Sequence, residues 1–237
     1  MMLNCEDMLE IDSEVIMYLR NSEPYGKSWE NWAADWCNWL LSIPRDKNPA
    51  NDESGINCSQ NQVDENVWFL AGTFGNYIPV RRKCTIPEPK ALLFPIANKE
   101  DSFAEDIDIK EEELLSRRAR TSMDRLIELQ LTVDGKRVLN LKKYRVLSVF
   151  FNLTFPEDNI YNVNPGLTRS VCDGYWAFLK PLPIGYHEIT FSAEIFLPKD
   201  DPVTIQIKNC PIHGSVTKEK NRNSIFKIGV TYELTIK

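Results

Sequence analysis

Residues 226–236 have the sequence FKIGVTYELTI, in which apolar and polar side chains alternate. The apolar positions are Phe226, Ile228, Val230, Tyr232, Leu234 and Ile236. Successive side chains of a strand point to opposite faces of a sheet, so this alternation predicts a long strand with one buried face. Residues 127–133 and 187–195 alternate in the same way. Several such strands joined by turns predict a mainly β fold, a single antiparallel β-sandwich of the jelly-roll or immunoglobulin-like type.

Turn and cap residues support this division of the chain. Asp134-Gly135 follows the alternating residues 127–133, and this dipeptide is typical of a type I′ hairpin turn. Ser28 is a favourable N-cap for a helix that ends before Pro44. Four tryptophans recur on one face of that helix: Trp29, Trp32, Trp36 and Trp39. The spacing favours a face buried on the sheets, and the alternative is an aromatic platform for a sugar or an apolar ligand.

The remaining elements define the expected domain organisation. Further helices are predicted over residues 6–20 and 110–125, strands over 67–71, 83–86, 91–96, 144–155 and 175–179, and loops over 45–66 and 156–174. We therefore expect an N-terminal helical extension over residues 1–66. It packs on a β-sandwich domain over residues 67–237, which carries one inserted helix, and the two parts form one compact unit.

The acidic composition excludes several classes of partner. The 237 residues contain 34 Asp and Glu against 28 Lys and Arg, a formal net charge of −6. A nucleic-acid partner or an anionic membrane surface requires a basic face, so neither is expected. No stretch approaches the roughly 18 consecutive apolar residues that span a bilayer. The acidic N-terminus is unlike a signal peptide, so we expect a cytoplasmic chain, or an exported one whose signal peptide has been removed.

Six cysteines leave two interpretations open. Cys58 and Cys84 flank one strand-like segment, and a disulfide between them would contribute about 3–4 kcal/mol in the chain-entropy model. The alternative is that all six are reduced and mostly buried as small apolar side chains. Six reduced thiols would favour a cytosolic protein that binds a partner.

Several strings in the chain are distinctive as a set. They are VWFLAGTFG (67–75), RRKCTIPEPKALLFPIAN (81–98), TVDGKRV (132–138), DGYWAFLKPLPIGYHEITFS (173–192) and VTYELTI (230–236). Together they resemble a widespread, poorly characterised bacterial protein family with a Trp-rich helix and a secretory leader. The chain departs from that pattern at Glu88-Pro89, where small residues usually precede Lys90, and its acidic N-terminal residues are not expected to form such a leader. The resemblance implies no particular activity.

No motif predicts catalysis, a cofactor or a metal. His187 falls on the apolar side of its strand and is expected to be a core or rim residue. Cys210-Pro-Ile-His213 has no second ligand pair at the spacing of a zinc site. The acidic stretch Asp101, Glu105, Asp106 and Asp108 lacks the glycine and terminal glutamate of a calcium loop and is expected to be a solvated connector.

The predicted binding site is the polar and aromatic cluster Asp173-Gly-Tyr175-Trp176, with Arg82 and Asn98 at other strand ends. Binding groups tend to lie where loops meet a rigid scaffold. We therefore expect a non-catalytic domain that binds a ligand or a protein partner, of unknown oligomeric state. The alternative is a carboxylate-dependent hydrolase that acts on a glycan at the rim of the sandwich. Its candidate carboxylates lie beside aromatic residues, at Glu30, Asp35 and Asp173.

Overall fold

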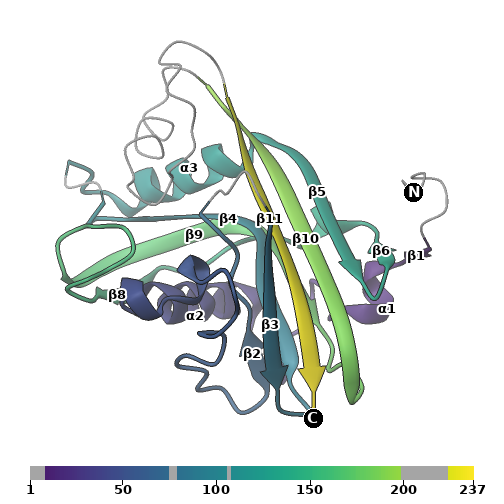
Figure 1. Cartoon of the computed structure of the whole chain (residues 1–237). Coiled ribbons are helices and arrows are strands. Elements are labelled where there is room, and N and C mark those ends of the chain that lie inside the picture. Colours follow the sequence, from purple (N-terminus) through teal and green to yellow (C-terminus); the bar gives the residue numbers. More distant parts are fainter. Residues whose placement is uncertain (1–8, 75–78, 106–107, 199–223) are drawn as a thin grey trace.

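The computed structural model describes residues 9–74, 79–105, 108–198 and 224–237. In this part of the chain the strands form two mixed sheets (Figure 1). The six-stranded sheet has the order β1 (Glu10–Ile11), β6 (Lys136–Val138), β5 (Leu126–Val133), β10 (Gly185–Leu197), β11 (Ser224–Ile236) and β3 (Val80–Ile86). The second sheet has the order β2 (Val67–Phe69), β4 (Ala91–Ser102), β9 (Gly166–Leu179) and β7 (Arg145–Leu147), and β8 (Phe151–Phe155) also pairs with β9. The helices are α1 (Ser13–Ile16), α2 (Trp29–Leu41) and α3 (Glu112–Met123).

The alternating residues 226–236 form most of β11, so this prediction is confirmed. Strand β11 pairs with β10 from Gly185↔Ile236 to Leu197↔Ser224, and it pairs on its other edge with β3. The hairpin turn is also confirmed, because Asp134 and Gly135 have φ values of 50° and 73° and join β5 to β6. Both values lie in the left-handed region that a type I′ turn requires.

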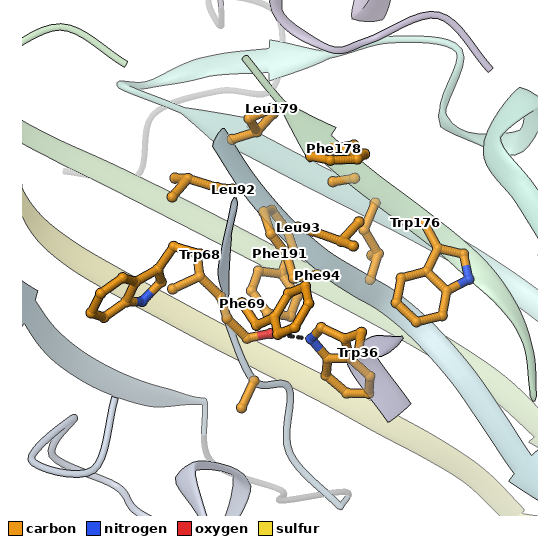
Figure 2. Packing of buried hydrophobic residues seen from close by; sticks show 14 of the residues in the cluster. Trp36, Trp68, Phe69, Leu92, Leu93, Phe94, Trp176, Phe178, Leu179 and Phe191 are labelled. Carbon is orange, nitrogen blue, oxygen red and sulfur yellow. Dashed lines mark hydrogen bonds between the residues drawn. The ribbon is translucent and has the colours of Figure 1, made fainter. Parts of the chain in front are cut away.

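The two sheets meet face to face through apolar side chains. The ring of Phe94 on β4 stacks on that of Phe191 on β10, with centroids 4.8 Å apart. Figure 2 shows both rings beside Phe69 and Trp36, in the middle of the buried cluster. This cluster contains residues from both sheets and from α2, so one hydrophobic core joins the N-terminal helical region to the strands.

The tryptophan stripe is confirmed as a buried face of α2. Ser28 caps this helix by accepting a hydrogen bond from the Asn31 backbone N–H. All four indoles are buried, and each donates its N–H to a backbone carbonyl. The pairs are Trp29 with Leu19 O, Trp32 with Pro24 O, Trp36 with Leu70 O and Trp39 with Gln60 O, at 2.8–3.0 Å. The Trp36 bond is the dashed line in Figure 2. The stripe therefore fastens neighbouring loops to the helix while its rings fill the core.

The mainly β fold is confirmed, and the wholly antiparallel arrangement is wrong. Among the described strands, three pairs run parallel, namely β1 with β6, β3 with β11 and β2 with β4. Alternation reports which face of a strand is buried, and it carries no information on the direction of a partner that is distant in sequence. Strands that follow each other in the sequence are antiparallel as expected: β5 pairs with β6, and β10 pairs with β11.

Some boundaries were also wrong. A helix was expected over residues 6–20. Among the described residues of this range, only the four residues of α1 are helical, and Glu10–Ile11 forms the strand β1. The loop over 156–174 contains the first half of β9, and the strand over 144–155 is two short strands, β7 and β8. Among the described residues, no helix combines the length and the apolar character needed to cross a bilayer.

Candidate functional site

A cavity of about 440 Å³ lies beside β4, between α2, the C-terminal end of α3 and the ends of β10 and β11. Its walls are largely apolar: α2 contributes Trp36, Leu40 and Leu41, and β10 and β11 contribute Ile195, Phe226 and Ile228. Helices α2 and α3 lie on opposite faces of the second sheet (Figure 1). The cavity therefore extends around the border of this sheet.

The local sequence of β4 explains why the sheet ends here. Strand β2 pairs with β4 only over Ala91–Leu93, and Pro95 follows. Proline has no N–H to donate to a neighbouring strand, so it occurs at sheet edges and bulges. The β4–β9 register shifts between Pro95 and Ala97. Beyond this bulge β4 pairs with β9 alone among the described strands, and residues 95–100 line the cavity.

Glu100 is the most unusual residue of the cavity wall. Its side chain is buried, with 1% of the residue exposed. One carboxyl oxygen, Oε1, accepts a hydrogen bond from the Ser170 hydroxyl, and the carboxyl group also interacts with that of Glu105. Burial raises the pKa of Glu100 well above its ordinary value, and the negative charge of Glu105 raises it further. Glu100 therefore keeps its proton to a higher pH than an exposed carboxyl group does.

The neighbouring charges are already paired. The Lys99 ammonium lies 3.1 Å from Asp101 Oδ1 and 3.3 Å from Glu105 Oε1, and it donates to the Glu100 backbone carbonyl. Arg118 Nη2 of α3 lies 3.4 Å from Asp101 Oδ1. Burial raises the pKa of Asp101 to about 6, although the Lys99 charge opposes this shift. The sequence predicts a solvated connector here, and this is wrong at Asp101 and Glu105. Both side chains belong to a largely buried network of ion pairs.

Two further polar groups border this end of the cavity. The Asn98 amide donates to Cys37 Sγ at 3.8 Å, and Cys37 also contacts Cys172 of β9. Burial raises the pKa of Cys37 well above its ordinary value, and contact with Cys172 raises it further, so the thiol stays protonated and is a poor nucleophile. Burial likewise raises the pKa of Tyr161, and the Glu100 charge adds to the shift. The polar end thus offers neutral hydrogen-bonding groups around a carboxyl group.

Arg82 and Asp173, two of the predicted binding residues, are buried in structural networks and do not line the cavity. The Arg82 guanidinium donates to Asp52 O, Ala71 O, Gly72 O, Ala50 O and the Tyr232 hydroxyl, at 2.6–3.3 Å. Asp173 accepts two hydrogen bonds from Arg145, at 2.6 and 2.9 Å. These contacts occupy the charged groups that a ligand would need.

The other three predicted residues are divided between the core and the cavity. Tyr175 packs with Ala97 and Met123 in a small cluster beneath α3, and Trp176 lies edge-on to Trp36 in the main core. Asn98 alone of the five lines the cavity. The structure thus does not bring the five together at one surface.

The remaining candidate residues have structural partners. The ring nitrogens of His187 lie 2.8 Å from Asp134 Oδ2 and 2.9 Å from Pro183 O. Glu30 pairs with Arg20, and Asp35 pairs with Lys27.

The cysteines divide into bonded and free residues. A disulfide joins Cys58 and Cys84, and Cys37 and Cys172 are free. Cys210, His213 and Asp106 lie outside the described residues. Within the described ranges, no three His, Cys, Asp or Glu side chains are grouped as metal ligands would be.

The sequence analysis missed Glu100 and Thr73, and it placed Glu105 in a solvated connector. A signal for Glu100 was present, because the polar residues Asn98 to Ser102 directly continue an apolar strand, where they can remain buried in the register of the sheet. Thr73 also lines the cavity, and its hydroxyl oxygen Oγ1 is buried without a hydrogen-bond partner. Nothing in the sequence around Thr73 marks it as part of a site.

No protein-family model, curated protein or solved structure matches this chain. The resemblance to a bacterial family stays a prediction. The geometry of the cavity therefore carries the functional argument by itself.

Proposed function

We propose that this chain is a non-catalytic binding protein whose cavity beside β4 holds a small, largely apolar molecule. One observation carries the proposal: a cavity of about 440 Å³ has largely apolar walls and a polar end, where Asn98, Glu100 and Tyr161 line it. Ligand sites are typically apolar hollows of this size with a few polar groups that orient the ligand.

The wall is built from elements that are held independently of a ligand. Trp36 is fixed by its bond to Leu70 O, and Arg82 holds the carbonyls of Ala71 and Gly72. The segment that carries Thr73 is thus fastened to α2 and to β3. Preformed walls lower the ordering cost of binding, which supports a binding site rather than a packing defect.

A hydrolase is the second candidate, and the pairing of Glu100 with Glu105 favours it. A carboxyl group with a raised pKa beside a second carboxylate is a known arrangement for acid–base catalysis. However, the two groups interact as a hydrogen-bonded pair, whereas the carboxyl groups of glycosidases lie about 5–9.5 Å apart to admit the sugar or a water. The apolar walls are also a poor match for a glycan. The non-catalytic function is therefore the better supported one.

A cavity-filling variant tests the proposal. Gly72 lines the cavity, its φ lies outside the left-handed region, and a Cβ there meets nothing within 4 Å. Gly72→Phe should therefore fold normally and abolish binding of a neutral fluorescent probe such as N-phenyl-1-naphthylamine. Gly72→Ala is the matched control, and it should bind the probe within about twofold of wild type because a methyl group fills little of the space.

Two outcomes would overturn the proposal. Probe binding that is absent from the wild type, or equal in wild type and Gly72→Phe, would remove the cavity as the site. Turnover of chromogenic glycosides or esters that disappears in Glu100→Gln would establish the hydrolase instead. A melting temperature for Gly72→Phe close to that of wild type ensures that lost binding is not lost folding.

A further inference from the structure

We infer that the ligand of this cavity is a short apolar peptide, which adds to the free edge of β4 as an extended strand. This inference rests on the proposed function and names the class of molecule that the cavity accepts. It follows from the direction of the main-chain groups of β4, from the apolar walls on both sides of its edge and from the mixed charges in the lining.

The main chain of β4 turns hydrogen-bonding groups toward the cavity at Asn98. Strand β4 pairs with β9 in an antiparallel ladder, where the N–H and C=O of alternate residues face the partner strand and those of the residues between face away. Phe103 donates its N–H to Arg169 O of β9, which fixes the alternation. The N–H and C=O of residues 98, 100 and 102 therefore face away from β9, toward the border of the sheet that the cavity follows.

Groups of two of these residues already have partners at this border. The Ser102 N–H donates to Glu105 Oε2 at 3.2 Å, and Glu100 O accepts from the Lys99 ammonium. Among the described residues, no group is paired with the Asn98 main-chain N–H or C=O on this side. Asn98 is half-buried and lines the cavity, so its main-chain donor and acceptor are the ones that a ligand can use.

Two other strand edges are occupied by polar groups of nearby loops. On the outer edge of β2, the Gln62 side-chain amide accepts from the Phe69 N–H at 2.9 Å and donates to Phe69 O at 2.8 Å. On the outer edge of β3, the Lys83 N–H donates to Ser54 O at 2.9 Å. Folded proteins cover strand edges in this way because an open edge pairs with another chain. The edge of β4 at Asn98 borders a cavity instead, which is the arrangement that strand addition needs.

Apolar walls lie on both sides of this edge. Helices α2 and α3 cover opposite faces of the sheet (Figure 1). The Asn98 side chain contacts Cys37 of α2, whereas Ala97 packs on the other side with Met123 of α3 and Ile195 of β10. Successive side chains of an added strand point to opposite faces, so they meet these two walls in turn. The peptide that fits is therefore apolar at consecutive positions.

The charges in the lining favour a neutral ligand. Two cations and two carboxyl groups line the cavity, those of Lys99, Arg125, Glu100 and Glu105. The Lys99 ammonium lies against Glu105, and Arg125 engages an interaction of its own. Charges of both signs give no preference for an anionic or a cationic head group. A main-chain amide is neutral and offers one donor and one acceptor, which match the C=O and the N–H of Asn98.

The experiment uses a neutral peptide of three residues, acetyl-Val-Leu-Val-methylamide, because residues 96–100 extend over roughly 13 Å at about 3.3 Å per residue. The peptide competes with N-phenyl-1-naphthylamine for the full-length wild-type protein at neutral pH. Three further peptides carry a methyl group on the nitrogen of the first Val, the Leu or the second Val. Alternate nitrogens of an added strand face β4. Methylation at either the Leu or the two Val positions should therefore weaken binding roughly tenfold or more, and methylation at the other positions less than about threefold.

Amide hydrogen exchange followed by NMR locates the contact on the protein. Exchange of the Asn98 N–H should slow roughly tenfold or more when the peptide saturates the site. The Ser102 N–H is the matched control, because it already donates to Glu105 and its exchange should not change. Saturation with 1-octanol, which has no amide, should leave both rates unchanged.

Asn98→Pro removes the main-chain donor. Because this N–H faces away from β9, proline takes no bond from the β4–β9 ladder. The variant should lose roughly tenfold or more in peptide affinity and keep its probe affinity within about threefold. Asn98→Ala is the matched control, because it removes the side chain and keeps the N–H, and its peptide affinity should stay within about threefold of wild type.

The outcomes distinguish the inference from the proposed function. Probe binding with equal affinities for the parent and the methylated peptides, or with unchanged exchange at Asn98, would overturn the peptide and leave the cavity as a binding site. Binding of neither the probe nor any peptide would overturn both. If Asn98→Pro fails to fold, the methylated peptides and the exchange rates of the wild type still decide the question.

Discussion

Removing one hydroxyl group, with Tyr232→Phe, tests the network that holds the cavity wall. The Tyr232 hydroxyl accepts hydrogen bonds from Arg82 Nη1 at 2.9 Å and from the Ala71 N–H at 3.1 Å, and it donates to Ala71 O at 2.9 Å. Phenylalanine keeps the ring that stacks on Phe191. The substitution therefore removes polar contacts and leaves the apolar packing in place.

The magnitude follows from which groups are left without a partner. Ala71 O still receives Arg82 Nη1 at 2.7 Å, and the guanidinium keeps the Gly72 carbonyl. The buried Ala71 N–H loses the hydroxyl that accepts its bond. An unsatisfied buried donor costs about 1–3 kcal/mol and a lost hydrogen bond about 1 kcal/mol, so we expect a loss of about 2–4 kcal/mol. This corresponds to a melting temperature lowered by roughly 5–15 °C for a chain of this length.

Urea denaturation followed by tryptophan fluorescence measures this loss, because Trp36 lies in the same core. The slope of the free energy with urea should be unchanged, since the surface exposed on unfolding is the same. Tyr186→Phe is the matched control, because Tyr186 is 63% exposed, and it should change stability by less than about 0.5 kcal/mol. Equal effects of the two substitutions would refute the reasoning, because they would mean that the Tyr232 hydroxyl stabilises nothing.

Two further substitutions give measurable outcomes. Gly174→Ala places a Cβ 2.6 Å from the Asn98 Cβ and 2.7 Å from Ala97 O, so we expect a loss of about 1–3 kcal/mol and weaker probe binding. Wild-type stability in urea would contradict this expectation. In the folded chain the pKa of Glu100 is raised, so its stabilising contribution is present at low pH and is lost as the pH rises through the folded pKa. Glu100→Gln should therefore gain stability over wild type as the pH increases from about 4 to 8, and a difference that is constant with pH would count against the buried carboxyl group.

The parts of the fold that could be predicted are those that local sequence determines. The type I′ turn needs only Asp134 and Gly135, and the start of α2 needs only Ser28 and the residues after it. The buried face of β11 follows from the alternation along one strand. In each case the signal and its structural result lie within a few residues of each other, so no knowledge of distant contacts is required.

The errors concern residues whose behaviour depends on distant partners. The predicted loop over 156–174 includes residues 166–174, which form the first part of β9 and carry polar side chains such as Ser170 and Asp173. In β9 these two are buried, because Glu100 and Arg145 satisfy them from other strands. A polar residue in a strand is therefore compatible with burial when the fold supplies its partner, and a sequence alone does not show that partner.

The same reasoning explains why the predicted site and the proposed site differ. Arg82 and Glu100 are equally buried charged residues, and in the sequence both stand beside strand residues. Five acceptors surround the Arg82 guanidinium, which does not line the cavity, whereas Glu100 does. Which of two buried charged residues borders open space depends on how distant elements pack, and the sequence around each residue does not show this. The position of Glu100 in the lining of a largely apolar cavity, rather than its charge, is therefore what supports the proposed site.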